Sequence, residues 1–212
     1  MTVTTITPEH RPELAALAAE TFKDIDWRHN GIGVLQGYVV DKGETESRFH
    51  IWHPSLMLPG MAEGGLYHDH RFDLLSHVLV GEIHHDELEV VPDPEGPYEF
   101  ARVTNARKAK AQGGHANGEF HSEPERLGER FRLEHHPMVI GANNTYLFPK
   151  LAFHGSSTRD LAVTYVEKRN QEDIKARLIV PFGEEYTHAF AHTRPRAEWE
   201  HLIDEAIEAI RG

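Results

Sequence analysis

The sequence contains no cysteine, which excludes disulfides, thiolate metal sites and a cysteine nucleophile. Basic residues are also few, because 22 Lys and Arg stand against 34 Asp and Glu and leave a net charge of -12. This balance disfavours nucleic acid and anionic membrane surfaces as partners, and it favours a small-molecule partner. The chain has no apolar run of about 18 residues and no basic N-terminal stretch leading into an apolar one. We therefore expect no membrane span and no signal peptide, and a cytoplasmic location.

Histidine, by contrast, is abundant, with 17 residues among 212. The chain is long enough for one domain with a sizeable core. We expect a single domain over 1–212, with a helical extension at 1–30, a β-barrel at 31–185 and a C-terminal helix at 186–212. Apolar residues recur at helical spacing in Pro8–Lys23 and again in 195–210, so helices are predicted at both ends.

Between these ends the sequence predicts an antiparallel barrel or sandwich. Short alternating segments are separated by Gly, Pro, Asn and Asp, which is typical of about eight or nine strands. The segments read GVLQGYVV, SRFHIWH, LLSHVLVGEI, DELEVVP, YEFARVTN, ERFRLEHHPMVI, NTYLFPK, LAVTYVEKR and ARLIVPF. The glycine-rich polar stretch 108–128 is either a lid or an ordinary surface loop, and its His115 and His121 are within possible reach of a site.

Two histidines stand one residue apart, at His68 and His70. On extended backbone both rings point to the same side, roughly 6 to 7 Å apart at the backbone. That spacing suits chelation of one ion at about 2.0 to 2.1 Å from each nitrogen. The alternative is a pair of solvated side chains. A further histidine, His154, follows a short turn after a strand that ends at Pro149, and this second element strengthens the case for a metal site.

With these two elements the sequence resembles the cupin superfamily, which consists of small double-stranded β-helix barrels of the jelly-roll class. His68, His70 and the later Gly81 resemble the first cupin motif, and Pro149 with His154 resembles the second. The resemblance implies a mainly β cupin barrel with N- and C-terminal helices. It also implies a metal held by His68, His70 and His154.

Two positions depart from the cupin pattern. Leu151 stands where the second motif has a glycine, and Leu74 stands where the first motif has a glutamate ligand. A set of three neutral imidazoles leaves the ion its full charge and leaves positions for two further ligands. This arrangement resembles that of the thiol dioxygenases and implies Fe(II), although imidazoles also accept Zn, Ni, Mn or Cu. The further motif of those enzymes is not reproduced in AVTYVEK, so a thiol substrate is not implied.

Three residues are candidates for catalysis beside the metal: Arg48, His50 and Tyr146. Alternation places Arg48 and His50 on one face of a strand with Trp52. Inside the barrel, Arg48 would clamp a substrate carboxylate. In the other orientation these side chains face outward, and Phe49 and Ile51 fill the core instead.

The sequence also predicts the orientation or role of several other residues near the motifs. Tyr146 and Phe153 flank the second motif and are candidates for an apolar wall around a ligand. His77 has the parity that points away from the metal. The pairs His84-His85 and His135-His136 each send one ring inward and one outward. Asp69 lies between the first two ligands and is expected to face away from the metal.

Three function classes compete. The first is a mononuclear non-haem dioxygenase, with Fe(II), of a small carboxylate or amino-acid-derived metabolite. The second is a non-redox isomerase, lyase or hydrolase that uses Zn or Mn. The third is a non-catalytic cupin that binds a small ligand. We also expect a homodimer, in which Trp199, Leu202 and Ile210 cover a sheet edge or a partner.

Overall fold

The computed structural model describes residues 2–5, 10–30, 32–42, 45–57, 67–102, 125–184 and 194–212. The predicted loop 108–128 lies outside the described residues except for 125–128, which belong to a strand. His115 and His121 therefore lie outside them too.

The described part of the chain is mainly β, with a helix near each end. The strands are β1 (Thr2–Thr5), β2 (Trp27–Asn30), β3 (Ile32–Lys42), β4 (Thr45–Met57), β5 (Asp73–Val80), β6 (Glu82–Pro92), β7 (Tyr98–Arg102), β8 (Glu125–Gly141), β9 (Asn144–Phe148), β10 (Phe153–Ser157), β11 (Ala162–Arg169) and β12 (Arg177–Pro181). The helices are α1 (His10–Thr21), α3 (His201–Arg211) and the single 3-10 turn η2 (Arg196–Glu198).

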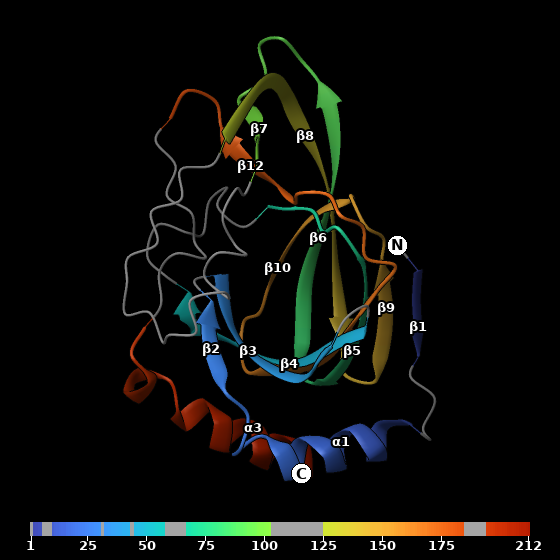
Figure 1. Ribbon diagram of the computed structural model, residues 1–212, viewed down its shortest axis with the longest axis vertical. Coiled ribbons are helices and arrows are strands. Elements are labelled where there is room, and N and C mark those ends of the chain that lie inside the picture. The colour runs from blue at the N-terminus through green and yellow to red at the C-terminus, as the bar shows by residue number, and fades with distance from the viewer. Residues whose placement is uncertain are drawn as a thin grey trace.

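The strands form two antiparallel sheets that curl around a common interior (Figure 1). One has the order β1-β9-β5-β11-β4-β3-β2, and the other has the order β10-β6-β8-β7-β12. Helices α1 and α3 lie together below the first sheet, and β7, β8 and β12 extend from the opposite end. The prediction of a mainly β barrel with helices near both ends is confirmed.

One predicted strand is two strands in the structure. The stretch from Leu74 to Ile83 is divided between β5 and β6 by a turn at Gly81. Gly81 has a φ of 71°, and a Cβ there would lie 2.3 Å from the carbonyl oxygen of Leu161. The glycine is needed because the turn passes too close to the neighbouring backbone for any side chain.

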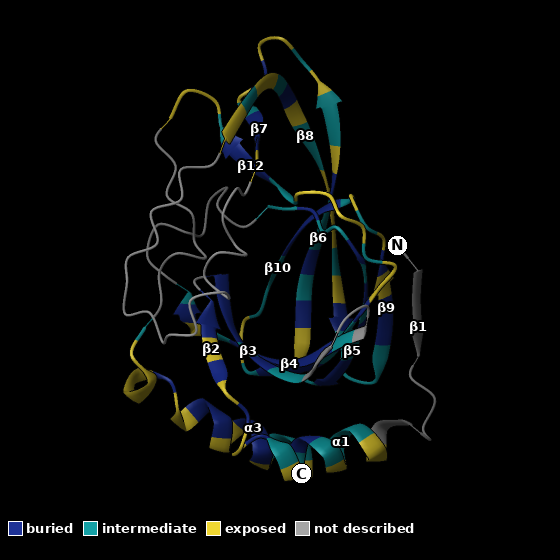
Figure 2. Ribbon diagram, in the orientation of Figure 1, coloured by how far each residue is buried: buried dark blue, intermediate teal, exposed yellow. Residues whose placement is uncertain are grey.

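The outer face of the seven-stranded sheet forms an apolar core with the helices. Phe49 and Ile51 of β4 are fully buried there, beside Phe22, which follows α1. Figure 2 shows the buried side of both helices turned toward the sheet. Trp199 and Leu202 are buried in this core and Ile210 packs against it, so these residues cover the protein's own sheet rather than a partner. None of the described helices is long and apolar enough to cross a membrane.

The inner face of the same sheet lines the barrel. It carries an apolar cluster that includes Val34, Trp52, Leu74, Val78, Ile83, Ile140, Tyr146, Phe148, Ala162 and Val166. Arg48 and His50 alternate with Phe49 and Ile51 along β4, and the His50 ring lies 5.5 Å from the Trp52 ring. The inward orientation of Arg48 and His50 is therefore the correct one of the two that the sequence allows.

Candidate metal centre

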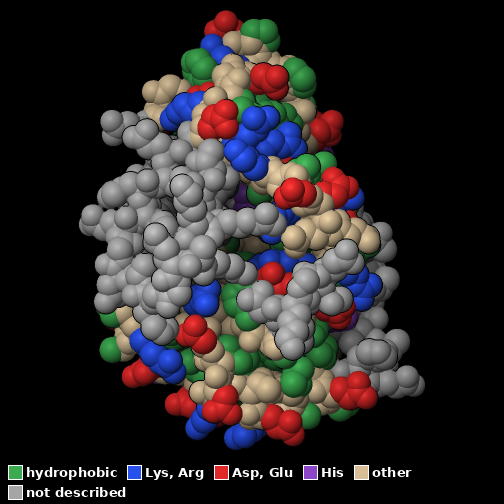
Figure 3. Space-filling model, viewed as in Figure 1, with side chains coloured by type: hydrophobic (Ala, Val, Ile, Leu, Met, Phe, Trp, Pro, Cys, Tyr) green, Lys and Arg blue, Asp and Glu red, His purple; other side chains and the backbone are tan. Residues whose placement is uncertain are grey.

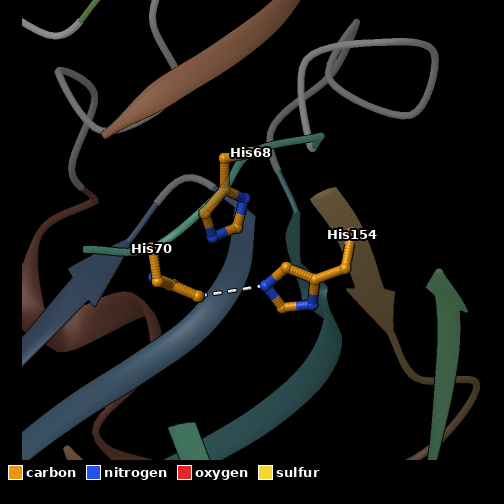
Figure 4. Close-up of side chains that lie close together, drawn as sticks. All are labelled: His68, His70 and His154. Atoms are coloured by element: carbon orange, nitrogen blue, oxygen red, sulfur yellow. Dashed lines mark hydrogen bonds between the residues drawn. The ribbon is translucent and has the colours of Figure 1, made fainter. Parts of the chain in front are cut away.

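The rings of His68, His70 and His154 converge on one point (Figure 4). Their centroids are 4.7 Å apart for His68 and His70, 4.8 Å for His68 and His154, and 5.0 Å for His70 and His154. The Nε2 atoms of His70 and His154 approach to 3.0 Å. The three side chains come from two segments far apart in the sequence, so the fold itself assembles the cluster.

Backbone hydrogen bonds fix the relative positions of the two segments. His68 lies on extended backbone outside the named strands, between β10 and β12. Its N–H donates to the carbonyl of His154, and the N–H of His154 donates back to the carbonyl of His68, both at 3.0 Å. Two of the three histidines are thus direct neighbours across a pair of strands. The sequence predicts His68 at the entry to a strand, and in the structure it is held by a bridge on each side instead.

Asp69 anchors the segment between the first two histidines. It is fully buried, and its carboxylate accepts hydrogen bonds from the backbone N–H of Arg177 at 2.6 Å and from the Arg177 Nε at 2.7 Å. The guanidinium of Arg177 lies over the rings of Phe100 and Phe153. Asp69 does face away from the histidines, as expected. The ion pair nevertheless fixes the segment that carries the histidines, because Asp69 is fully buried and would be an uncompensated charge without Arg177.

Leu151, at the position of the missing motif glycine, has a φ of 65°. Its N–H donates to the carbonyl of His70 at 2.8 Å, which ties the turn before β10 to the first pair of histidines. The left-handed backbone that favours glycine is therefore kept with leucine in place. The side chain is exposed, so it has room in this conformation.

On the side away from the cluster, the ring of His154 contacts His85. The Nδ1 of His154 lies 3.5 Å from the Nδ1 of His85 and 3.4 Å from the Oγ of Ser156. Ser156 also lies 3.1 Å from the Nδ1 of His85. Phe148 covers the His154 ring, with centroids 4.3 Å apart. Contacts of this kind hold an imidazole in one orientation and leave its Nε2 for a ligand.

The side of His70 away from the cluster is covered by Phe72. The two rings stack with centroids 4.8 Å apart and planes 27° apart. The ammonium of Lys168 lies 4.6 Å from the Phe72 centroid, on the inner face of β11. A cation over an aromatic face is an attractive arrangement.

Burial is the main cause that keeps the imidazoles of His70 and His154 uncharged. Burial holds the pKa of His70 well below its usual 6.5, and the charges of His68, Arg48 and Lys168 act in the same direction. Burial does the same to the pKa of His154, aided by His68 and His70. A neutral ring is the form that binds a metal.

The cluster suits a divalent transition metal. All three residues offer one nitrogen, and these atoms lie within 4.8 Å of one another. Two nitrogens that bind one ion at 2.0 to 2.1 Å are at most about 4.2 Å apart, so a small movement of the rings closes the set. The Nε2 atoms of His70 and His154 are within hydrogen-bond distance, with the donor set by the tautomer, and a bound ion would take the place of the proton between them. A three-histidine site of this kind accepts several divalent metals.

The other predicted residues lie at different distances from the cluster. Arg48 and His50 are buried on the inner face, and both interact electrostatically with His70. Tyr146 is buried with its ring 5.6 Å from His85, so it contacts the wall behind His154. Phe153 alternates with His154 and packs instead on Phe100, in a separate apolar cluster.

His77, His84 and His85 follow the predicted parity, whereas the prediction that one ring of His135 and His136 points inward is wrong. His77 lies on the outer side, where its Nδ1 contacts the Oγ1 of Thr145 at 2.8 Å. His85 is buried, whereas His84 pairs with Glu82 at the surface. His135 pairs with Asp86 and His136 with Glu89, and both rings are about half exposed. Neither ring of that last pair is buried in the barrel.

A cavity of about 640 Å³ lies beside β10. Its described lining residues include Leu88, Phe100, Ala152, Phe153 and Arg177. It lies on the side of β10 where Phe153 points, so His154 is separated from it by the strand. We therefore do not assign it to the metal centre.

Comparisons with known proteins give only distant matches. No protein-family model matches the sequence, and no curated protein matches it significantly. Similar solved structures include hydroxypropylphosphonic acid epoxidase from S. wedmorenis, with 9% identity over 69% of this chain and 56% of that one and a TM-score of 0.39. An RmlC-like cupin from Shewanella frigidimarina has 13% identity over 71% of this chain and 89% of that one, with a TM-score of 0.36. Oxalate decarboxylase from Bacillus subtilis has 10% identity over 89% of this chain and 37% of that one, with a TM-score of 0.40.

A cupin is thus among the solved structures that the chain resembles. The chain spans 56% of the epoxidase and 37% of the decarboxylase, so much of those proteins has no counterpart in it. Likeness at these identities and scores says nothing about the activity of this protein. Its function must be inferred from its own residues.

Sequence reasoning missed Phe72, Phe148 and Lys168 around the cluster, and for His85 it predicted only that one ring of the pair with His84 points inward. Phe72 stands two residues beyond His70, and the same period of two predicts that it shares a face with the histidine. His85 and Phe148 belong to different strands, and their approach to His154 depends on the pairing of β10 with β6. No local pattern in the sequence reports that pairing.

Proposed function

We propose that the protein is a mononuclear non-haem metal enzyme in which His68, His70 and His154 hold Fe(II). The proposed reaction is a dioxygenation of a small carboxylate or amino-acid-derived metabolite. The observation that supports it most is the composition of the cluster, since the grouped donors among the described residues are three histidines. Bound Fe(II) would supply a redox centre for dioxygen and open positions for a substrate.

The residues around the cluster support this proposal. Leu74, where a glutamate ligand would stand in the cupin pattern, is buried among apolar inner-face side chains, including Phe72 and Phe148. These apolar side chains exclude water and offer no anionic donor. The ligands available to a metal from the three histidines therefore remain neutral. His85 and Ser156 hold the orientation of His154, and Phe72 holds that of His70.

A second candidate is a non-redox isomerase, lyase or hydrolase that uses Zn or Mn at the same histidines. The same neutral three-imidazole set favours it, because catalytic zinc sites use three protein ligands and keep a position for water. The third candidate, a ligand-binding cupin without catalysis, needs no reactive metal at all. Ni and Cu also fit imidazole donors.

The metal and oxygen consumption separate these candidates. Freshly purified protein is analysed for its metal content, then reconstituted with Fe(II) without oxygen and exposed to nitric oxide as a substitute for dioxygen. The dioxygenase predicts the electron paramagnetic resonance signal of an iron–nitric oxide adduct, together with oxygen uptake on addition of a substrate. Protein that carries only zinc, gives no such signal and consumes no oxygen with any candidate acid or thiol would favour the non-redox enzyme.

The location and assembly of the protein are further parts of the proposal. A net charge of -12 supports a small-molecule partner over nucleic acid or a membrane surface. We propose a cytoplasmic location for the enzyme. We also propose a homodimer formed through sheet edges, since edge strands leave backbone groups to be paired. Light scattering at micromolar concentration tests it, and a monomeric mass would exclude the dimer.

A further inference from the structure

The inner face of the barrel carries a group of charged side chains beside the three histidines. Arg48 and Glu46 lie on β4 and Lys168 lies opposite them on β11. Each is about nine-tenths buried, with side-chain exposures of 9%, 11% and 10%. Charges so deep in a barrel are costly unless they are paired or serve a ligand.

Glu46 is the internal partner of these cations. Its Oε1 accepts a hydrogen bond from the Lys168 ammonium, and the same oxygen is 3.8 Å from the Arg48 Nη1. The Lys168 pair is therefore a direct contact, whereas the Arg48 pair is too long for a hydrogen bond. Arg48 Nη1 has a further contact with the hydroxyl of Tyr38, at 3.4 Å.

Among the described residues, several buried polar atoms have no hydrogen-bond partner, and two of them lie on the inner face of β4. They are the Nε of Arg48 and the Nε2 of His50. The two residues are two positions apart on β4, so their side chains leave the strand on the same side. An unsatisfied buried donor costs about 1 to 3 kcal/mol, so each such group requires an explanation, and a bound ligand is one. The front face is hollowed above the sheet, and Lys or Arg side chains are visible there (Figure 3).

This group adjoins the candidate metal centre. Lys168 lies over the ring of Phe72, and Phe72 in turn stacks on His70. The charges of Arg48 and Lys168 also contribute to the lowered pKa of His70, which places them within electrostatic reach of it. Burial first, and then the same two cations, hold the pKa of His50 well below 6.5, so its ring is neutral and donates from Nε2 in one of its two tautomers.

We propose that Arg48 and His50 bind a carboxylate group of a small molecule whose other end reaches His68, His70 and His154. Arg48 offers its Nε–H and positive charge to one carboxylate oxygen, and His50 offers its Nε2–H to the other. Glu46 keeps Lys168 neutralised and holds it beside Phe72, so Lys168 positions the site without contacting the ligand. The inference deepens the proposed function and rests on it only for the part of the ligand that lies at the histidines.

The chain contains a matched control for Arg48. Arg28, on β2, also lies over the ring of Tyr38, with its guanidinium carbon 5.7 Å from the centroid, compared with 5.8 Å for Arg48. Its side chain is 59% exposed and pairs with Asp26. Removing either arginine changes the net charge equally, but only Arg48 has the buried, unpartnered Nε.

Calorimetric titration of the metal-free full-length protein tests the proposal without any dependence on the metal. The probes are acetate and succinate, their uncharged amides acetamide and succinamide, and inorganic phosphate. Wild type is expected to bind a carboxylate and not its amide. Arg48→Met is expected to weaken that binding by at least about 10-fold, as the loss of a charge-assisted hydrogen bond does. His50→Phe should weaken it by less, and Arg28→Met should leave it unchanged.

Several results would overturn the proposal. They are no carboxylate binding to wild type, equal binding by wild type and Arg48→Met, equal weakening by Arg28→Met, or tighter binding of phosphate than of either carboxylate. If Arg48→Met does not fold, Arg48→Lys takes its place, because it keeps the charge and loses the Nε–H. Carboxylate binding without a nitric oxide signal from the Fe(II) protein would sink the dioxygenase and leave the carboxylate site standing. A nitric oxide signal without carboxylate binding would exclude the carboxylate site and leave the iron centre standing.

Discussion

The two faces of strand β4 have opposite characters. Phe49 and Ile51 point outward into a core that α1 and α3 complete, and both are fully buried. Arg48 and His50 point inward, are almost as deeply buried, and have buried nitrogens without hydrogen-bond partners. One strand therefore carries closely packed apolar side chains on one side and incompletely satisfied polar ones on the other.

The difference separates stability from function. Apolar burial on the outer face contributes about 1.5 to 3 kcal/mol for each large side chain. The unsatisfied nitrogens on the inner face contribute nothing and cost stability. Natural proteins accept such costs mainly at sites that act on something else. We infer that the helices stabilise the sheet from outside, so that its inner face is free to carry chemistry.

The largest expected effect comes from the outer face. Phe49→Ala should lower the free energy of unfolding by about 3 to 5 kcal/mol, because it empties a site packed by Phe22 and Tyr165. Its inner neighbour supplies the comparison, since Arg48→Met should stay within about 1 kcal/mol of wild type. Urea denaturation of both variants measures the contrast. Equal losses at the two positions would remove the distinction between the faces.

Acid should destabilise the inner face selectively. Burial is the largest cause that lowers the pKa of His85 from 6.5 to about 4, so protonation favours the unfolded chain. The stability that His85 contributes is therefore complete above pH 6.5 and declines between pH 6.5 and about 4, by about 3 kcal/mol in total. His50, His70 and His154 act in the same direction.

Urea denaturation of the metal-free protein at a series of pH values measures this loss. His85→Phe should make the curve shallower over the same range, because the variant has no proton to take up there. A free energy of unfolding that stays constant between about pH 7 and 5 would mean that the histidines are solvated or already charged.

Leu74→Glu places an anion on the inner face, at the position of the missing ligand. Without metal the variant should lose about 1 to 3 kcal/mol of stability, because a buried carboxyl group has no partner prepared for it. With metal it should recover, hold the ion at least as tightly as wild type and give a weaker nitric oxide response. Thermal denaturation with and without Fe(II) measures the difference. Leu74→Gln is the uncharged control. A variant that Fe(II) does not rescue would show that position 74 cannot reach the ion.

The smallest effect is expected at His77, which is on the outer side of β5. Its contacts with Thr145 and Glu167 lie away from the histidine cluster. His77→Ala should change the free energy of unfolding by about 1 kcal/mol or less and leave metal content unchanged. Metal lost from this variant would show that the two faces are not independent.

Much of the fold was predictable because strands report their two faces by alternation. The period of two in β4 predicts that Arg48 and His50 share a face, but not which face lines the barrel. The helices decide which face of β4 lines the barrel, because Trp199 and Leu202 are buried in the same core as Phe49 and Ile51. A helix packed across a sheet is a tertiary contact that no local pattern shows.

The candidate site was predictable to a similar extent. His68, His70 and His154 were predicted together from the spacing of two motifs, and the structure brings them together. The roles of Asp69 and His85 were not predictable, because each depends on a partner brought close by strand pairing. Glycine at 151 was expected from the cupin pattern, and the structure keeps its backbone conformation with leucine instead.

The most direct test of the account is the metal content of the purified protein and its histidine variants. Elemental analysis after reconstitution with Fe(II) is expected to give one ion per chain for wild type. His68→Ala, His70→Ala and His154→Ala should each lower metal affinity by at least about 100-fold, since each removes one of three ligands. Wild type that holds no metal, or a His154→Ala variant that binds it as tightly as wild type, would contradict the central claim that these three histidines form a metal centre.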